Sequence, residues 1–211
     1  MKTKVLVLGA GGAIAQHVIR FLKDNNDIEL TLFARNIQQL ENTSSNVNLI
    51  EGDVLNSENL DQAIKGQNIV YANLAGDIDK MATLISEAMK KNGVNRLIFV
   101  TCLGVYDEVE GKFGEWNNRM IGSDLIRYGE ATQNIEKSGL DYTVVRPSWL
   151  TDNDETEYET TQKGQPFRGT EVSRKAVGAY IADIILHPEQ DVKASVGVNK
   201  PGVYGDKPSF Y

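Results

Sequence analysis

The chain of 211 residues has little cysteine and little histidine: Cys102, His17 and His187 are the only examples. A single thiol excludes an intramolecular disulfide, and these three side chains do not easily make a soft-metal site. Lysine and arginine, 22 together, are also outnumbered by the 29 aspartate and glutamate residues. The formal net charge of −7 disfavours non-specific binding to nucleic acids or to anionic membranes. Both classes of partner are therefore unexpected.

Long apolar runs are missing too. No stretch approaches the ~18 apolar residues of a membrane-spanning helix. The short apolar run near the start leads directly into glycines, unlike a secretory signal with a cleavage site. We therefore expect a cytoplasmic protein. A hydrophobic content of 41% suits one core better than two, so we expect a single domain over residues 1–211.

What the sequence does contain is an alternation of short apolar runs with segments of helical periodicity. The runs predict strands at 4–8, 28–34, 47–51, 68–72, 96–101 and 142–146. The periodic segments predict helices at 12–24, 57–65, 78–92 and 125–137. This alternation predicts an α/β fold, a Rossmann-type doubly wound parallel sheet covered on both faces.

Particular residues define these helices. Ser57 is the expected N-cap of the second helix, and Gly93 is the expected stop of the third. The buried face of the first helix is predicted as Ile14, Val18, Phe21 and Leu22, and that of the third as Met81, Leu84, Ile85, Ala88 and Met89.

Two segments interrupt the alternation. Residues 103–122 have no clean period, and they follow the fifth strand to the carboxyl edge of the sheet, where open α/β proteins bind ligands. Residues 151–169 are polar and suit a short hairpin that is either a surface excursion or a cover for the substrate. Residues 199–211 are rich in proline and glycine and predict a loop. We expect residues 151–211 to form a small elaboration on the substrate side.

The glycine-rich turn after the first strand is the most informative motif. A tight turn requires Gly9, Gly12 permits a close approach of a pyrophosphate, and Ala15 lets the helix pack on the sheet. The start of the following helix offers free N–H groups and partial positive charge to phosphates. A tight turn in any α/β protein is the alternative, but the position at the first strand of a long series favours a dinucleotide. The predicted cradle comprises Gly9, Ala10, Gly11, Gly12, Ala13, Ile14 and Ala15.

The end of the second strand indicates which dinucleotide. NAD sites place an acidic residue there, about 20 residues past the glycines, on the ribose 2′-hydroxyl. Glu29 has this spacing but begins the strand, ~20 Å from its end at ~3.3 Å per residue. Arg35 lies at the ribose end, where a guanidinium suits a 2′-phosphate, although a solvated surface arginine is the alternative. We favour NADP(H) over NAD(H).

Taken together, several motifs resemble the atypical short-chain dehydrogenase/reductase superfamily, and in particular its NAD(P)H-binding, NmrA-like and flavin/biliverdin-reductase-like members. The resemblance covers almost the whole chain, through GAGGAIA, TLFARN, EGDV, YANLAG, VTCLGVY and SGLDYTVVRPSWL. Each motif alone is weak, whereas the set is specific for the superfamily.

The resemblance implies further cofactor contacts. It places Asp53 and Val54 at the adenine, although Asp53 also suits a role as a loop-terminating acid. It assigns other residues to the ribose and diphosphate, to the end of the fifth strand and to the nicotinamide: Asn73, Leu74, Ala75, Thr101, Pro147, Ser148 and Trp149.

The catalytic dyad of the superfamily is incomplete. A Ser at the end of the fifth strand and a Tyr-x-x-x-Lys on the next helix are usual, because the Lys lowers the Tyr pKa for proton transfer. Matching the motifs puts Cys102 at the Ser position, beside Thr101. Tyr128 matches either the Tyr position, with Thr132 replacing the Lys, or the Lys position itself. Thr101, Cys102 and Tyr128 remain the candidate catalytic residues, and Lys112 is a candidate cation from outside the helix.

Redox chemistry does not require the dyad, because hydride transfer to a flavin-like or quinone-like ring needs mainly alignment and exclusion of water. A wall for such a ring, or else plain core, is offered by Tyr106, Trp116, Trp149 and Phe167. The sequence thus predicts an oxidoreductase that reduces a small flavin-like, quinone-like or carbonyl acceptor, with homodimer formation possible. The alternative is a non-catalytic, NmrA-like redox sensor that regulates a partner. A nucleotide-sugar epimerase is disfavoured by the short segment after Leu150.

Overall fold

The computed structural model describes residues 2–40 and 46–211 and is built around a central sheet of eight strands. The strand order is β3-β2-β1-β4-β5-β6-β10-β8, and every neighbouring pair is parallel except β10 and β8. The strands of this sheet are β1 (Thr3–Leu8), β2 (Ile28–Ala34), β3 (Val47–Glu51), β4 (Ile69–Ala72), β5 (Arg96–Val100), β6 (Asp141–Pro147), β8 (Glu159–Gln162) and β10 (Ala194–Asn199). A second, two-stranded sheet pairs β7 (Trp149–Thr151) with β9 (Glu171–Ser173).

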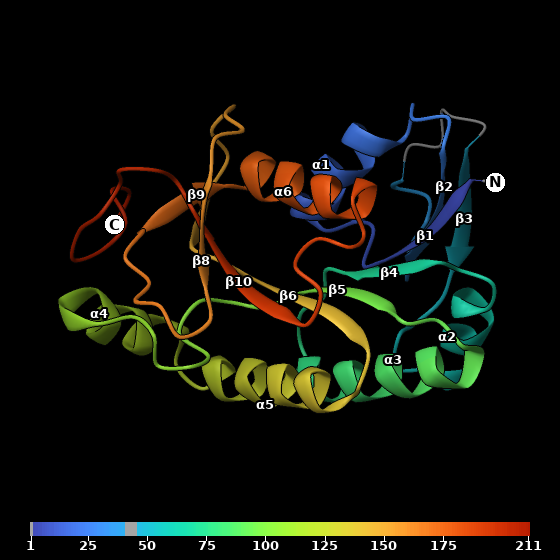
Figure 1. Ribbon diagram of the computed structural model, residues 1–211, viewed down its shortest axis with the longest axis horizontal. Coiled ribbons are helices and arrows are strands. Elements are labelled where there is room, and N and C mark those ends of the chain that lie inside the picture. The colour runs from blue at the N-terminus through green and yellow to red at the C-terminus, as the bar shows by residue number, and fades with distance from the viewer. Residues whose placement is uncertain (1, 41–45) are drawn as a thin grey trace.

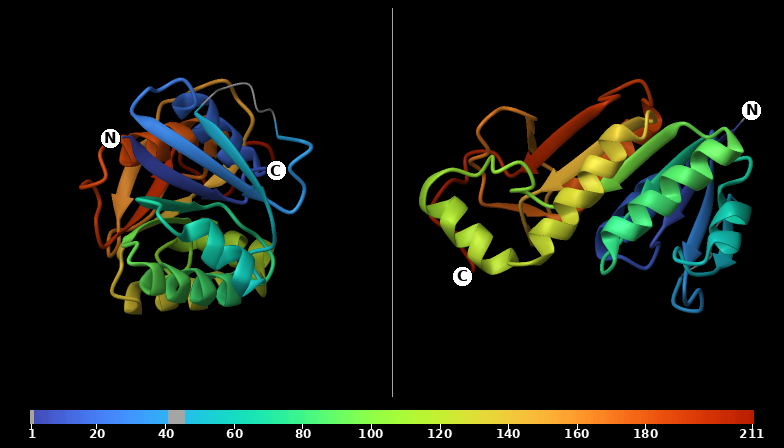
Figure 2. Two further views of the ribbon diagram at one scale, coloured as in Figure 1. Left: turned by 90° about the vertical axis from the view of Figure 1, so that its right-hand side faces the viewer. Right: turned by 90° about the horizontal axis from the view of Figure 1, so that it is seen from below.

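Helices cover both faces of the central sheet, as the views along and across it show (Figures 1 and 2). On one face α1 packs beside α6, and on the other α3 packs between α2 and α5. Figure 1 places α4 at the far end of the molecule, beyond β6 and β10. The helices are α1 (Ala13–Leu22), α2 (Ser57–Ile64), α3 (Ile78–Asn92), α4 (Gly111–Ile121), α5 (Asp124–Lys137) and α6 (Arg174–Leu186).

The alternation of side chains along β1 explains the two layers. Val5 and Val7 enter the core beneath α1 and α6, whereas Leu6 and Leu8 enter the core beneath α2, α3 and α5. All four side chains are fully buried. A strand buried on both faces needs apolar residues at every position, which is why this run does not alternate with polar residues.

The predicted fold class, a doubly wound α/β sheet of the Rossmann type, is confirmed, and the six predicted strands are present to within one residue at each end. The stop at Gly93 is confirmed as well: its φ is +68° and its N–H donates to the carbonyl groups of Lys90 and Met89. Two details were wrong. The side chain of Asn56, not Ser57, caps α2, and Phe21 is 42% exposed because the buried stripe of α1 runs through Ala15 and Ile19 instead.

Residues 103–122 are not irregular throughout, because α4 occupies their second half. Glycines and asparagines give this segment little intrinsic helix propensity. The helix forms because tertiary packing favours it: Phe113 is buried beside Leu103, Val109 and Phe167. Gly114 is required here, because a Cβ at this position would lie 1.9 Å from the carbonyl oxygen of Val109.

The local hairpin expected within residues 151–169 is absent from the part of the chain that the structure describes. β8 pairs instead with β10, more than thirty residues away. The preceding stretch is tied to the start of α6, where Arg174 pairs with Asp152 at 2.8 Å and Lys175 with Asp154 at 2.6 Å. The segment is therefore part of the sheet and of its α6 side. The predicted loop at 199–211 contains, beyond β10, neither helix nor strand.

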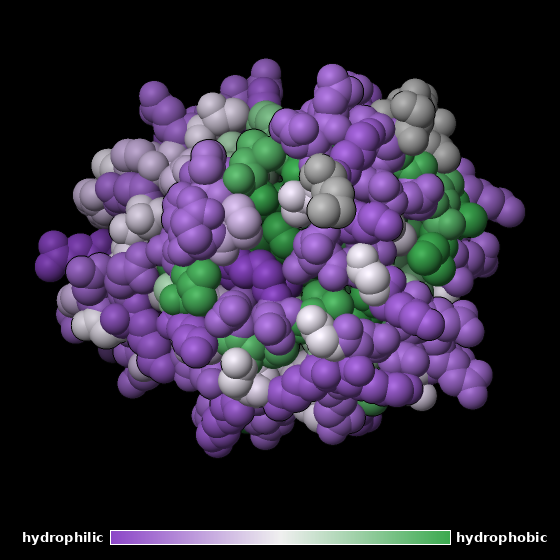
Figure 3. Space-filling view, turned by 45° about the vertical axis from the view of Figure 1, so that its right-hand side comes forward, coloured by the Kyte–Doolittle hydropathy of each residue, from purple (hydrophilic) through white to green (hydrophobic). Residues whose placement is uncertain are grey.

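Within the described ranges, no helix is long and apolar enough to cross a membrane. Figure 3 shows one face of the molecule, on which apolar residues form separate patches within a mainly hydrophilic surface.

Candidate functional site

Because β1 to β6 are parallel, their carboxyl ends meet at one edge of the sheet, and most of the predicted site residues follow these ends. The chain leaves β1 with β2 on one side and β4 on the other. This reversal of strand order is the switch point at which open α/β proteins bind ligands.

The glycine turn after β1 is closely packed. Gly9 has a φ of +78°, and a Cβ there would lie 2.2 Å from the carbonyl oxygen of Asn73. A Cβ on Gly12 would lie 2.0 Å from the side-chain nitrogen of Asn73, whereas one on Gly11 would meet nothing within 4 Å. The amide of Gln16 donates to the carbonyl of Ala10 at 2.6 Å, a brace that sequence reasoning missed. The turn is thus pressed against β4 and is open beside Gly11.

The start of α1 fits an anion. Gly12 occupies the N-cap of α1. The first turn of this helix has no acidic residue, and among the described residues no side chain caps its start. The first N–H groups of the helix therefore lack the side-chain acceptor that Asn56 provides at α2. An uncapped N-terminus beside a glycine turn is the donor set that a dinucleotide pyrophosphate requires.

The outer end of the site is formed by the segments after β2, β3 and β4. Arg35 follows β2 directly, is exposed, and makes no hydrogen bond or ion pair with another described residue. Glu29 lies at the opposite end of β2, as predicted by counting residues along the strand, and its carboxylate accepts a hydrogen bond from Asn48. Asp53 accepts the N–H of Leu55, which is the loop-forming role weighed as its alternative. Ala75, after β4, is exposed.

Several predicted contact residues turn their side chains away from the edge. Ala10, Ile14, Ala15 and Val54 are core residues, and Leu74 packs against the same core as Val54. Pro147 is a buried residue of β6, and the hydroxyl of buried Ser148 donates to the carbonyl of Gly169 at 2.7 Å. These residues offer mainly backbone to a ligand. Ala13, Gly11 and Asn73 keep access to the edge, and the whole set stays a prediction.

The candidate catalytic side chains form a poor proton relay. The hydroxyl of Thr101 is buried and donates to the carbonyl of Val145 at 3.4 Å. Burial, reinforced by Glu108 and Asp124, raises the pKa of the Cys102 thiol to about 12. Burial also raises the pKa of Tyr128, and Cys102 adds to the shift, so these two groups lie near each other. The Thr101 hydroxyl is thus already engaged, and the raised pKa values make Cys102 and Tyr128 weaker acids than the free side chains.

α5, which carries Tyr128, also lacks the lysine of the Tyr-x-x-x-Lys motif. The hydroxyl of Thr132, at the position where one alignment expects lysine, donates to the backbone carbonyl of Tyr128 at 2.7 Å. Lys112 is exposed and pairs with Asp206 at 3.4 Å. Neither residue brings positive charge to the Tyr128 hydroxyl.

The four aromatic candidates separate into different environments. Trp116 and Trp149 contact each other edge to face, with ring centroids 4.7 Å apart. Phe167 is 2% exposed and belongs to the small core beneath α4, so the alternative of plain core holds for it. The Tyr106 hydroxyl donates to Glu136 at 2.6 Å, and its ring faces the charged groups of Arg146 and Lys163.

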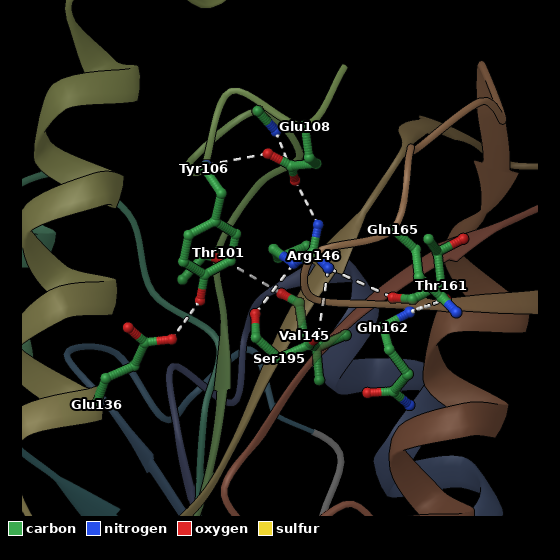
Figure 4. Close-up of polar contacts among 11 residues, drawn as sticks. Thr101, Tyr106, Glu108, Glu136, Val145, Arg146, Thr161, Gln162, Gln165 and Ser195 are labelled. Carbon is green, nitrogen blue, oxygen red and sulfur yellow. Dashed lines mark hydrogen bonds and ion pairs between the residues drawn. The ribbon is translucent and has the colours of Figure 1, made fainter. Parts of the chain in front are cut away.

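A buried ion pair behind the site was not anticipated. Arg146 of β6 is fully buried and pairs with Glu108 of the loop after β5 (Figure 4). Its guanidinium also donates to the hydroxyl of Ser195 at 3.0 Å and to the backbone carbonyl of Thr161 at 3.3 Å. The only sequence signal was a charged residue within a β-branched strand.

Glu108 links Arg146 to the backbone of the loop that follows β5. Its two carboxylate oxygens accept the backbone N–H groups of Gly104 at 3.0 Å and Tyr106 at 2.9 Å. The ring of Tyr106 lies over the guanidinium of Arg146, whose Cζ is 5.2 Å from the centroid of the tyrosine ring. The loop that continues from Cys102 is thus fixed to β6, β8 and β10 through one arginine. No group of three or more metal-ligating side chains occurs among the described residues.

The fold and the glycine turn together define a Rossmann-type dinucleotide-binding protein. A sequence profile of the family described as NAD(P)H-binding matches residues 9–188. The chain therefore belongs to this NAD(P)H-binding family, and the resemblance to NAD(P)H-binding members of the superfamily is confirmed.

Solved structures and a curated relative agree with this assignment. A Rossmann-fold NAD(P)-binding family protein from Shigella flexneri is 46% identical over all of both chains, with a TM-score of 0.87. A short-chain dehydrogenase/reductase from Veillonella parvula, in complex with NADP, is 30% identical over all of both chains, with a TM-score of 0.92. An NAD(P)H azoreductase from Xenophilus azovorans is 24% identical over 71% of this chain and 49% of its own length.

Proposed function

We propose that this protein is an NADP(H)-dependent oxidoreductase that reduces a planar ring of the flavin or quinone type. The observation that carries the proposal is the uncapped start of α1, where Gly12 leaves N–H donors free beside an open turn. A bound reduced nicotinamide would supply a hydride. The residues of the chain would then hold its phosphates, align the acceptor and exclude water.

The preference for NADP(H) rests on Arg35. Its guanidinium follows β2, at the edge where the ribose of a dinucleotide lies, and it has no carboxylate partner among the described residues. A free guanidinium suits a 2′-phosphate, which it binds through two parallel hydrogen bonds. The NADP complex of the Veillonella parvula protein supports this preference.

Replacing Arg35 by alanine should weaken NADPH binding by about 1.5–3 kcal/mol, the scale of a charge-assisted hydrogen bond, and leave NADH binding nearly unchanged. Calorimetric titration of both cofactors measures the difference. Arg20→Ala is the matched control, because Arg20 is also an exposed arginine and lies in the last turn of α1, away from the carboxyl edge. Equal losses for both cofactors, or tighter native binding of NADH, would refute the assignment.

The choice of a ring over a carbonyl acceptor follows from the poor proton relay. A carbonyl oxygen that gains a hydride must also gain a proton from a donor within ~3 Å. Thr101 is committed to Val145, and the pKa values of Cys102 and Tyr128 are raised. A flavin or quinone ring spreads the negative charge over its own heteroatoms and takes its proton from water. The chain then needs only to stack the ring.

The oxidation of NADPH at 340 nm against flavins, quinones and aldehydes tests this function. With a flavin acceptor we expect Thr101→Val and Tyr128→Phe to lose less than tenfold in turnover. A proton relay would instead lose roughly 10²–10⁴-fold on either substitution. Trp149→Ala should cost more than both, because it removes a stacking surface. A large loss from Tyr128→Phe alone would overturn the stacking mechanism.

The absent dyad also favours the second candidate, a dinucleotide sensor that performs no chemistry. A sensor would bind NADPH and oxidise it with none of the acceptors. The loop of residues 103–110 would then become resistant to proteolysis when NADPH is added. Turnover with any acceptor in the panel excludes this alternative.

A further inference from the structure

Three aromatic rings form a closed cluster beyond the carboxyl end of β6. Trp149 begins β7 two residues after that strand, Trp116 comes from α4, and Tyr211 comes from the segment after β10. The ring centroids are 4.7 Å apart for the two tryptophans, 5.0 Å for Trp116 and Tyr211, and 5.4 Å for Trp149 and Tyr211. All three contacts are edge to face. Figures 1 and 2 place α4 and the end of the chain together at this side of the molecule.

The two tryptophans are rigidly held. The indole N–H of Trp149 donates to the side-chain oxygen of Asn117 at 3.0 Å, and Asn117 is fully buried. Phe113 stacks on Trp116 with the ring planes 21° apart. Both indoles also pack against the small core beneath α4. Trp116 and Trp149 therefore make a fixed aromatic platform.

Tyr211 is held much more weakly. Tyr211 is 51% exposed, and the neighbouring Phe210 is 49% exposed. Its backbone N–H donates to the carbonyl of Pro208 at 3.3 Å, and the N–H of Ser209 donates to the carboxylate of Glu171 at 2.8 Å. The ring contacts of Tyr211 with the described residues are the two edge-to-face contacts with the platform and a contact with its neighbour Phe210. Tyr211 belongs to no helix or strand, so the fold places few constraints on its ring.

We propose that Tyr211 is a displaceable lid and that its ring occupies the position at which a planar aromatic acceptor stacks on Trp116 and Trp149. The platform has the chemistry for this ligand class, since indole rings bind flat π-systems by offset stacking and edge contacts. Its place at the end of β6 puts it on the ligand-binding edge of the sheet. The proposal rests on the proposed function for the role of the ring as acceptor, but the aromatic site itself is testable without the cofactor.

The intrinsic fluorescence of the protein reports directly on this site, because the chain has two tryptophans and both belong to the platform. Titration of the full chain with lumiflavin, an uncharged flavin ring, should quench this emission. The acceptor must displace the lid, so its apparent affinity equals its intrinsic affinity multiplied by the fraction of molecules whose lid is open. Tyr211→Ser should therefore tighten lumiflavin binding by roughly fivefold to a hundredfold, the range expected for two edge-to-face ring contacts. Tyr211→Phe keeps the ring and should bind as the native protein does.

Tyr204→Ser is the matched control. Tyr204 lies in the same segment and is 57% exposed, but its hydroxyl donates to Glu159 and its ring makes no aromatic contact among the described residues. Lumiflavin affinity should not change in this variant. Unchanged or weaker binding in Tyr211→Ser, or no quenching in any variant, would overturn the lid. Tighter lumiflavin binding in Tyr211→Ser, together with no NADPH oxidation by any acceptor of the panel, would keep the aromatic site and refute the oxidoreductase proposal instead.

Discussion

Gly12→Val should abolish NADPH binding. A Cβ at residue 12 would lie 2.0 Å from the side-chain nitrogen of Asn73 and 3.2 Å from the carbonyl oxygen of Gly9. The amide of Asn73 must move, and the two γ-carbons of valine then fill the approach to the first N–H groups of α1. Loss of two charge-assisted hydrogen bonds, at about 1.5–3 kcal/mol each, weakens binding by more than ~100-fold. Calorimetric titration should show no heat of binding.

Gly129→Ala separates this effect from a general loss of structure. Gly129 lies within α5, where a Cβ would meet only the carbonyl oxygen of Val105, at 3.9 Å. This variant should bind NADPH normally, and both variants should keep the native circular dichroism spectrum. Normal binding by Gly12→Val would remove the glycine turn from the cofactor site.

Arg146→Met should destabilise the protein by about 3–5 kcal/mol, because Glu108 then remains buried without its ion-pair partner. The side chain of Glu108 is 5% exposed, and the backbone N–H groups that it accepts compensate only part of its charge. Such a loss is a large fraction of the 5–15 kcal/mol that typically stabilises a domain. Equilibrium unfolding in urea at neutral pH measures it.

Two further variants make this prediction specific. Arg127→Met removes an exposed ion pair with Asp77, at 3.8 Å, and should change the stability by less than about 1 kcal/mol. The double variant Glu108→Leu/Arg146→Met should cost less than the sum of its single substitutions, since the two side chains interact directly. Additive losses would show that Arg146 acts through Ser195 and Thr161 rather than through Glu108.

The features predicted well from the sequence are those that depend on local pattern. β1 is a short β-branched run followed by glycine, and it is fixed by burial on both faces. The end of α3 depends on Gly93 alone, because a left-handed residue stops a helix wherever it occurs. The position of Glu29 at the wrong end of β2 could likewise be derived by counting residues along a strand.

Elements fixed by distant partners escaped prediction. α6 is apolar around most of its circumference, because α1 and the sheet bury it, so its helical period is weak. The partner of β8 is β10, and no turn sequence could reveal a pairing with a strand so far along the chain. The prediction that Phe21 lies on the buried face of α1 was wrong for a related reason. Hydrophobicity alone does not show which stripe of a helix faces the sheet.

The site was predictable where backbone geometry decides it and unpredictable where side chains from separate segments meet. The spacing of the glycines was enough to predict the roles of Gly9 and Gly12 in the turn. The contact of Asn73 with Gly12, by contrast, depends on the pairing of β1 with β4. Arg146 and Tyr211 contact partners on other elements, so the local sequence could not show those contacts.

The order of strands at the far side of the sheet has a consequence for how the chain folds. β10 lies between β6 and β8 and is parallel to β6. The pairing of β6 with β10 therefore requires a crossover connection from residue 147 to residue 194. Long-range parallel pairings of this kind form slowly, because the entropy of closing the loop is lost before the contacts are gained. During synthesis on the ribosome, β8 emerges before the strand that it pairs with. The half of the sheet that carries the glycine turn can therefore assemble first, and the side that carries β8 and β10 is completed only after residues 194–199 have left the exit tunnel.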